Sequence, residues 1–211
     1  MIVAVIGANG RTGRQFVQAA LEAGLTIRAG VRGPHDLFDH PNMVIVACDA
    51  LSKREIRDLI QGSDAVVSLL GHGPGVSATV QKTATEYTLA AMKEFGIARF
   101  ISLTGTGVRM PGDKPGLMDR LGNWVISSFE PERVRDGVAH AHVMMQSDRD
   151  WTLLRVLKLT NGKHDGQPIL AANVPSEMFT PRARVAAAIL QLLGSPEYIR
   201  QAPVIRGVGK Q

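Results

Sequence analysis

Three glycines near the start of the chain have the spacing of a phosphate-binding turn. Gly7, Gly10 and Gly13 stand in the segment GANGRTG, which follows an apolar stretch and opens a helical pattern. Gly7 permits a tight exit from a strand, Gly10 lets the backbone approach a pyrophosphate, and Gly13 lets the helix lie close to the sheet. The alternative interpretation is that the glycines only make the turn compact and bind no phosphate. The remaining residues of the predicted dinucleotide turn are Asn9, Arg11 and Thr12.

The residue that distinguishes NAD from NADP is expected about twenty residues beyond such a turn. The second predicted strand ends there in Val31, Arg32 and Gly33, without a carboxylate to bind the ribose hydroxyls of NAD. A guanidinium can pair bidentately with a 2′-phosphate, although Arg32 can equally be a solvated surface residue. The sequence therefore predicts NADP(H) as the cofactor and NAD(H) as the less favoured one.

Further candidate contacts follow the later strands. Asp49 can accept a hydrogen bond from the adenine amino group, or it can simply end a strand, and Ala50 belongs to the same predicted site. The fourth strand leads to Leu70 and Gly71, and the segment GHGPG beginning there should lie along the cofactor. Thr104 ends the fifth strand, so we expect it to orient the nicotinamide and to be the catalytic residue.

Histidine and cysteine side chains offer other chemistry. His72, within GHGPG, can donate a proton near the nicotinamide, or it can be an ordinary solvated histidine. His140 and His142 are two residues apart on a predicted helix and point to different faces, so we predict no metal site. Cys48, in the apolar stretch VIVAC, is expected to be a buried hydrophobe rather than a nucleophile.

The elements that must position these residues alternate along the chain. Strands are predicted over 2–6, 25–32, 43–50, 64–71, 97–105 and 150–159, and helices over 11–24, 52–62, 79–96, 131–148 and 180–194. Such alternation requires parallel strands with right-handed crossover helices. The predicted fold class is therefore α/β, a Rossmann-type doubly wound parallel sheet.

Local signals refine this prediction. Ser52, with Glu55 three residues later, and Thr180, followed by Pro181, are expected to cap the helices that they precede. The region Val108 to Glu130 is rich in Gly, Pro and Met. We expect it to be a late insertion over the cleft, with a short helix around 117–128.

Composition limits the class of protein. A chain of 211 residues, 45% hydrophobic and 20% charged, is predicted to form one domain over 1–211. It has no apolar run of bilayer length and no signal-peptide pattern at its start, so we expect a cytoplasmic protein without a membrane partner. The net charge is +5, but Lys and Arg are scattered and aromatic residues make up only 5%, so we predict no nucleic-acid partner.

The segments GANGRTG, ISLTG and DWTLLR, with the arginine-ended second strand, resemble the atypical short-chain dehydrogenases/reductases. The nearest branch is the NAD(P)H-binding group of flavin and biliverdin-IXβ reductases and nitrogen-regulator-type cofactor sensors, and the resemblance covers nearly the whole chain. The wider family relays protons through Tyr-x-x-x-Lys, but neither Tyr87 nor Tyr198 is followed by Lys at that spacing. Gly105 and Gly137 also replace polar residues that are usual in the family. In the reductase branch, which lacks the relay too, protons come largely from solvent.

The resemblance implies an NADPH-dependent reductase that transfers a hydride to a planar small-molecule acceptor such as a flavin, a quinone or a tetrapyrrole. A non-catalytic NADP(H) sensor is the alternative, because the relay is missing. A sugar-nucleotide epimerase or dehydratase ranks third. We expect a monomer or a homodimer.

Overall fold

The computed structural model describes residues 1–73, 75–105, 107–113, 131–163, 166–173 and 175–209. The strands are β1 (Ile2–Ile6), β2 (Thr26–Val31), β3 (Met43–Ala47), β4 (Ala65–Ser68), β5 (Arg99–Gly105), β6 (Asp150–Val156), β7 (Lys158–Thr160), β8 (Gln167–Ala171), β9 (Phe179–Pro181) and β10 (Val204–Gly209). The helices are α1 (Arg11–Glu22), α2 (Lys53–Ile60), α3 (Val80–Phe95), α5 (Pro131–Met145) and α6 (Arg182–Leu193).

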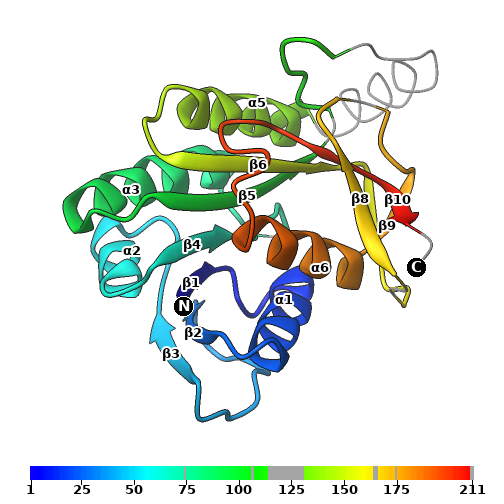
Figure 1. Cartoon of the computed structure of the whole chain (residues 1–211). Coiled ribbons are helices and arrows are strands. Elements are labelled where there is room, and N and C mark those ends of the chain that lie inside the picture. The colour runs from blue at the N-terminus through cyan, green and yellow to red at the C-terminus, as the bar shows by residue number, and fades with distance from the viewer. Residues whose placement is uncertain (74, 106, 114–130, 164–165, 174, 210–211) are drawn as a thin grey trace.

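An eight-stranded sheet forms the centre of the molecule, in the order β3-β2-β1-β4-β5-β6-β10-β8 (Figure 1). Every neighbouring pair is parallel except β10 with β8. The order of the first six strands is that of the doubly wound dinucleotide-binding sheet, in which ligands bind where the winding reverses between β1 and β4. The predicted Rossmann-type fold is confirmed.

Two apolar layers enclose this sheet. On one face, β1, β2 and β5 pack against α1 and α6, and on the other the alternate residues of the strands pack against α2, α3 and α5 (Figure 1). Strand side chains alternate between faces. Ile101 and Leu103 therefore face α1 and α6, whereas Phe100 lies in the opposite layer with residues of α3 and α5. By the same alternation, Ser102 and Thr104 are directed toward α3 and α5.

The end of the chain differs from the sequence expectation. Strands β8, β9 and β10 were not predicted, and the predicted strand 150–159 divides into β6 and β7. Thr180 is not the cap of α6, because it lies in β9 opposite Leu159 of β7, and its buried hydroxyl has no hydrogen-bond partner among the described residues. Pro181 takes the capping position without a side-chain bond. Because Thr180 pairs with β7, it belongs to a strand and α6 begins after it.

The region that we expect over the cleft, Val108 to Glu130, is described only to residue 113, so the helix predicted around 117–128 lies outside the described residues. The start of the region is firmly attached. Arg155 on β6 is fully buried and donates to Asp113 Oδ2 over 2.6 Å, to Ala202 O over 2.7 Å and to Val108 O over 3.2 Å. One guanidinium therefore joins β6 to the segment after β5 and the segment before β10.

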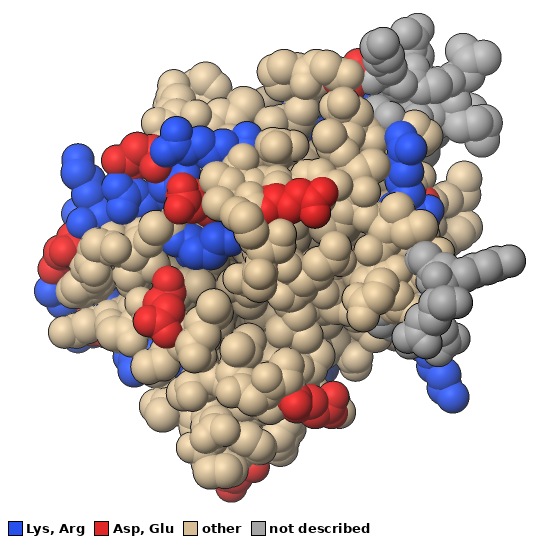
Figure 2. Space-filling model, in the orientation of Figure 1, with Lys and Arg blue, Asp and Glu red and all other residues tan. Residues whose placement is uncertain are grey.

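Charged residues of both signs gather at the left of the face shown in Figure 2, over the ends of α2 and α3. In this part of the molecule Arg57 of α2 pairs with Glu94 of α3 at 2.6 Å. The end of α3 lies at the amino-terminal edge of the sheet, opposite the edge that carries the glycine turn. Among the described helices, none is long and apolar enough to cross a membrane.

Candidate cofactor and active site

The glycine turn leaves no room for side chains. Gly7 has φ +81°, and a Cβ there would lie 3.2 Å from Leu69 O. A Cβ on Gly13 would lie 2.2 Å from Gly7 O and 2.6 Å from Ala8 O, distances that real Cβ atoms do not reach. Close packing of α1 against the turn therefore requires glycine at position 13, which is the role predicted for it.

The N-terminus of α1 is open. Gly10 is its N-cap, and no side chain caps the helix. The first helical bond is from Arg14 N to Gly10 O, 2.9 Å, so the amides of Arg11, Thr12 and Gly13 receive no backbone acceptor from the described residues. Unsatisfied amides and the helix dipole make such a terminus a binding site for anions. This donor set fits the pyrophosphate of a dinucleotide.

Asn9 joins the turn to the loop after β2. Its Nδ2 donates to Pro34 O over 3.3 Å, and its Oδ1 accepts from Asp36 N over 3.1 Å. Arg14 of α1 pairs with Asp36 at 2.7 Å. The loop that begins at Arg32 is therefore fixed beside the turn. Arg32 itself is exposed and has no hydrogen bond or ion pair with any described residue, so the predicted phosphate contact and a solvated surface position both stay open.

Hydrogen bonds link Asp49 and Glu55 in the turn between β3 and α2. Asp49 Oδ1 accepts from Leu51 N over 3.0 Å, and Asp49 N donates to Glu55 Oε2 over 2.7 Å. Ser52 caps α2 as predicted, by accepting from Glu55 N over 3.3 Å. Both Asp49 and Ala50 are thus held at the strand end, and the adenine contact assigned to Asp49 stays a prediction.

Cys48 has the character expected of it. The thiol is buried, and burial, followed by the nearby carboxylates of Glu55 and Asp49, raises its pKa to about 12. A thiol with this pKa is protonated at neutral pH and is a poor nucleophile.

Gln81 on α3 joins the ends of the two strands that carry the other predicted contacts. Its Nε2 donates to Leu70 O over 2.9 Å and to Leu103 O over 3.3 Å. Leu70 also lies against the glycine turn, since a Cβ on Gly7 would be 3.4 Å from Leu70 Cδ2. The structure thereby brings Gly7, Leu70 and Thr104 together along one edge of the sheet.

Thr104 is 5% exposed and lies under α5. A Cβ on Gly137 would be 3.2 Å from Thr104 Oγ1 and 3.1 Å from Val108 Cγ2, so only a residue of glycine's size lets α5 approach so closely. The glycine that departs from the family pattern therefore has a packing role beside the hydroxyl of Thr104.

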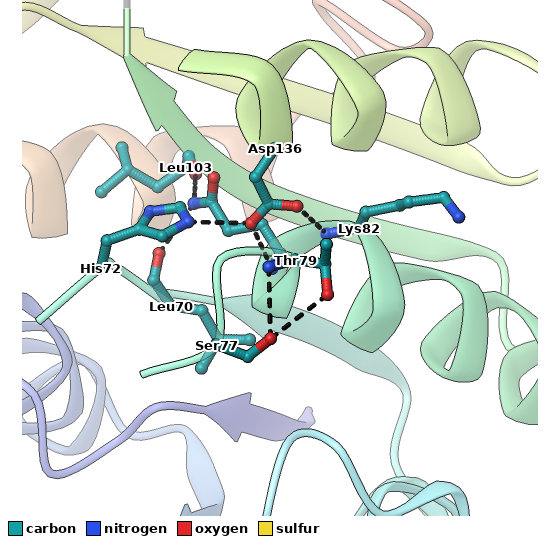
Figure 3. A network of polar contacts seen from close by, with 8 residues as sticks. Leu70, His72, Ser77, Thr79, Lys82, Leu103 and Asp136 are labelled. Atoms are coloured by element: carbon teal, nitrogen blue, oxygen red, sulfur yellow. Dashed lines mark hydrogen bonds and ion pairs between the residues drawn. The ribbon is translucent and has the colours of Figure 1, made fainter. Parts of the chain in front are cut away.

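A carboxylate that the sequence analysis did not identify, that of Asp136, lies at the centre of a polar network with His72, Lys82 and the loop before α3 (Figure 3). Asp136 of α5 accepts from Gln81 N over 2.8 Å and from Lys82 N over 3.0 Å. These are amides of the first turn of α3, whose N-cap residue Thr79 makes no capping bond. Asp136 therefore caps α3 from another helix. Its Oδ2 also lies 2.9 Å from His72 Nε2.

The environment of Asp136 keeps it ionised. Burial by itself would raise the pKa of this carboxyl, but hydrogen bonds from His72 and from the amides of Lys82 and Gln81 outweigh it and lower the pKa. One helical turn later, His140 is 1% exposed, and neither of its ring nitrogens has a hydrogen-bond partner in the described part of the chain. Burial lowers the pKa of His140 to about 4, although Asp136 opposes the shift. His142 is exposed, so the two histidines do face apart as predicted.

Asp136 and Gln81 escaped sequence analysis because their partners are distant in the chain: 64 residues separate His72 from Asp136, and 55 separate Gln81 from it. A helix surface pattern does not distinguish such a carboxylate from a solvated one. The described residues hold no cluster of His, Cys, Asp or Glu that could bind a metal.

Fold and site together define a dinucleotide-binding protein of the Rossmann type. The model of a family described as NAD(P)H-binding matches residues 7–196. The chain belongs to this NAD(P)H-binding family, and the predicted membership in the atypical dehydrogenase/reductase group agrees with it.

Solved structures of similar proteins cover almost the whole chain. The oxidoreductase ylbE from Lactococcus lactis is 19% identical, with a TM-score of 0.79 over 100% of this chain and 92% of that one. A short-chain dehydrogenase/reductase from Veillonella parvula, determined in complex with NADP, is 16% identical, with a TM-score of 0.81 over 99% and 95%. A candidate NAD-dependent epimerase/dehydratase from Bacillus halodurans is 20% identical, with a TM-score of 0.74 over 98% and 94%. At these identities the likeness establishes the fold.

Proposed function

We propose that this protein is an NADPH-dependent reductase that transfers a hydride to a planar acceptor such as a flavin, a quinone or a tetrapyrrole. The observation that carries the proposal is an open α1 terminus beside an exposed Arg32 that has no partner among the described residues, on a loop that Asn9 fixes next to the turn. One supplies donors for a pyrophosphate, and the other supplies a cation for a 2′-phosphate. The NADP complex of the Veillonella parvula relative supports the same cofactor.

The residues of this chain mainly bind and orient. The amides of Arg11, Thr12 and Gly13 would hold the pyrophosphate, Arg32 the 2′-phosphate, and Asp49 with Ala50 the adenine end. Leu70 and Gly71 would line the middle of the cofactor, and Thr104 its nicotinamide amide. A bound nicotinamide supplies the hydride, so positioning is the main contribution of the protein.

Replacing Arg32 with Glu tests the cofactor assignment. The exchange puts a carboxylate where NAD-binding proteins hold the ribose hydroxyls, so NADPH should bind roughly 100-fold more weakly while NADH binds no worse. Fluorescence titration with both cofactors measures this ratio. Arg54→Glu makes the same charge change on α2 and should leave the ratio unaltered. An unaltered NADPH to NADH ratio in Arg32→Glu would remove Arg32 from the site.

Turnover tests the reductase assignment. NADPH oxidation is followed by absorbance with FMN, a quinone and biliverdin offered in turn. Turnover with any of them supports the reductase. Tight NADPH binding without turnover would instead favour the cofactor sensor, for which the missing Tyr and Lys relay is the specific argument. The same missing Tyr-x-x-x-Lys relay speaks against the epimerase chemistry that the Bacillus halodurans relative suggests.

A further inference from the structure

Asp136 holds the imidazole ring of His72 in one orientation. His72 lies two residues beyond Leu70, on the loop that leaves β4, and its side chain is only 16% exposed. Asp136 is on α5 and its side chain is 1% exposed. The network ties both to the strand ends, because Asp136 holds Gln81 N and Gln81 holds the carbonyls of Leu70 and Leu103. The Gln81 side chain therefore holds both the chain just before His72 and the chain just before Thr104.

The geometry fixes the tautomer of His72. An ionised carboxylate can only accept hydrogen bonds, and Asp136 already accepts from two backbone amides. Nε2, 2.9 Å from Asp136 Oδ2, must therefore carry the hydrogen that it donates. The other ring nitrogen, Nδ1, is turned away from Asp136 in Figure 3 and makes no hydrogen bond with a described residue. It is the nitrogen left for a ligand.

The binding role of the network does not need His72. Asp136 completes the cap of α3 through the amides of Gln81 and Lys82 alone, and the Lys82 side chain is occupied with Glu86 at 3.2 Å. A half-buried imidazole with one nitrogen fixed by a carboxylate is the arrangement in which a histidine transfers protons through its other nitrogen. This arrangement lies at the carboxyl edge of the sheet, where the family binds its cofactor.

We propose that His72 supplies, through Nδ1, the proton that accompanies hydride transfer to the acceptor, and that Asp136 is the residue that positions it. The inference rests on the reductase function proposed above and gives this chain a proton donor where the Tyr and Lys relay is missing. For a quinone the balance is NADPH + quinone + H⁺ → NADP⁺ + hydroquinone. The step uses the doubly protonated ring: the quinone gains the hydride, and one of its oxygens takes the Nδ1 proton of His72 as that N–H bond breaks. The neutral ring, still protonated at Nε2, then takes a proton from water at Nδ1.

The test compares two planar acceptors that differ in their need for a proton. A quinone requires one in addition to the hydride, whereas the cation methylene blue becomes its neutral leuco form by gaining the hydride alone. His72→Gln keeps an amide that can donate to Asp136 but cannot release a proton. We expect kcat with the quinone to fall roughly 100-fold in this variant, and kcat with methylene blue to change less than about threefold.

Controls separate the chemistry from folding. His142→Gln makes the same exchange at the exposed histidine of α5 and should leave both rates at the wild-type level. Urea unfolding and NADPH titration show whether His72→Gln is folded and binds cofactor. In addition, ¹⁵N spectra of the cofactor-free protein should show that the neutral ring of His72 carries its proton on Nε2, which leaves Nδ1 as the site that gains and releases the second proton. Asp136→Asn, which can donate an amide hydrogen to the ring, should remove that preference.

The outcomes distinguish the two proposals. If the wild type oxidises NADPH with neither acceptor, the reductase function is wrong whatever the state of His72. If the wild type reduces both acceptors and His72→Gln lowers both rates equally, or neither, then His72 is not the proton donor and the reductase function still stands. A spectrum with the His72 proton on Nδ1 would likewise overturn the oriented pair.

Discussion

Two helices begin at the same edge of the sheet and treat their first amides in opposite ways. At α1 the N-cap is Gly10, no side chain caps the helix and no described backbone group accepts from Arg11, Thr12 or Gly13. At α3 the corresponding donors are taken by Asp136, a carboxylate from a different helix. An open terminus costs stability that a capped one keeps. Within the described structure, the first amides of α3 are therefore satisfied by the protein itself, whereas those of α1 stay available to a ligand.

Gly13→Ala should break the α1 side of this comparison with the largest effect. A methyl group 2.2 Å from Gly7 O forces the turn apart, so NADPH affinity should fall by roughly 100-fold or more. Fluorescence titration measures the affinity, and thermal melting reports the accompanying loss of stability. Gly24→Ala is the matched control, because Gly24 has φ +78° and open space around it. It should cost about 1 kcal/mol of stability and leave NADPH affinity unchanged.

Asp136→Ala should break the α3 side. It leaves two amides of α3 and the His72 ring without their acceptor, which should lower the free energy of unfolding by about 3 to 4 kcal/mol. Urea unfolding provides the measurement. Asp136→Asn keeps one carbonyl oxygen and should lose clearly less. Equal stability of Asp136→Ala and the wild type would mean that the capping of α3 by Asp136 contributes nothing to the free energy of unfolding.

His140 adds a pH dependence to the same helix. Its pKa is about 4 in the folded protein against an ordinary value of 6.5, so the unfolded chain takes up the proton first as the pH falls. The protein should therefore lose roughly 3 kcal/mol of stability between pH 6.5 and pH 4 from this group, and nothing above pH 6.5. Urea unfolding at several pH values tests this. His140→Leu should flatten the profile across that window, whereas His142→Leu, on the exposed face, should not.

The smallest expected effect is on stability, and it distinguishes a helix capped by its own N-cap residue from one capped by a residue of another helix. Ser52 accepts from Glu55 N at the start of α2, so Ser52→Ala should cost about 1 kcal/mol. Thr79 occupies the same position at α3, but its hydroxyl makes no capping bond and pairs, among the described residues, with Ser77 Oγ in its own loop. Thr79→Ala should therefore change stability by less than about 0.5 kcal/mol. A loss at Thr79 as large as that at Ser52 would show that α3 depends on its own cap after all.

The sequence was sufficient wherever a structural requirement is local. Gly13 and the Ser52 cap are each determined within a few residues of chain, and the alternation of strands and helices follows from apolar periodicity. It was insufficient where the partner is remote. Asp136 looks like any acidic residue on a helix until α5 packs beside α3, and Gly137 looks like a lost functional group until Thr104 lies under it. Thr180 resembled a cap because its pairing with β7 depends on the tertiary fold.

The buried pair of Arg155 and Asp113 bears on how the protein can be altered. Asp113 fixes the chain just before residue 114, and Asp136 fixes it again shortly after residue 130, each to the sheet or a helix and independently of the other. Because the two anchors use different partners, loss of one should leave the chain beside the other in place.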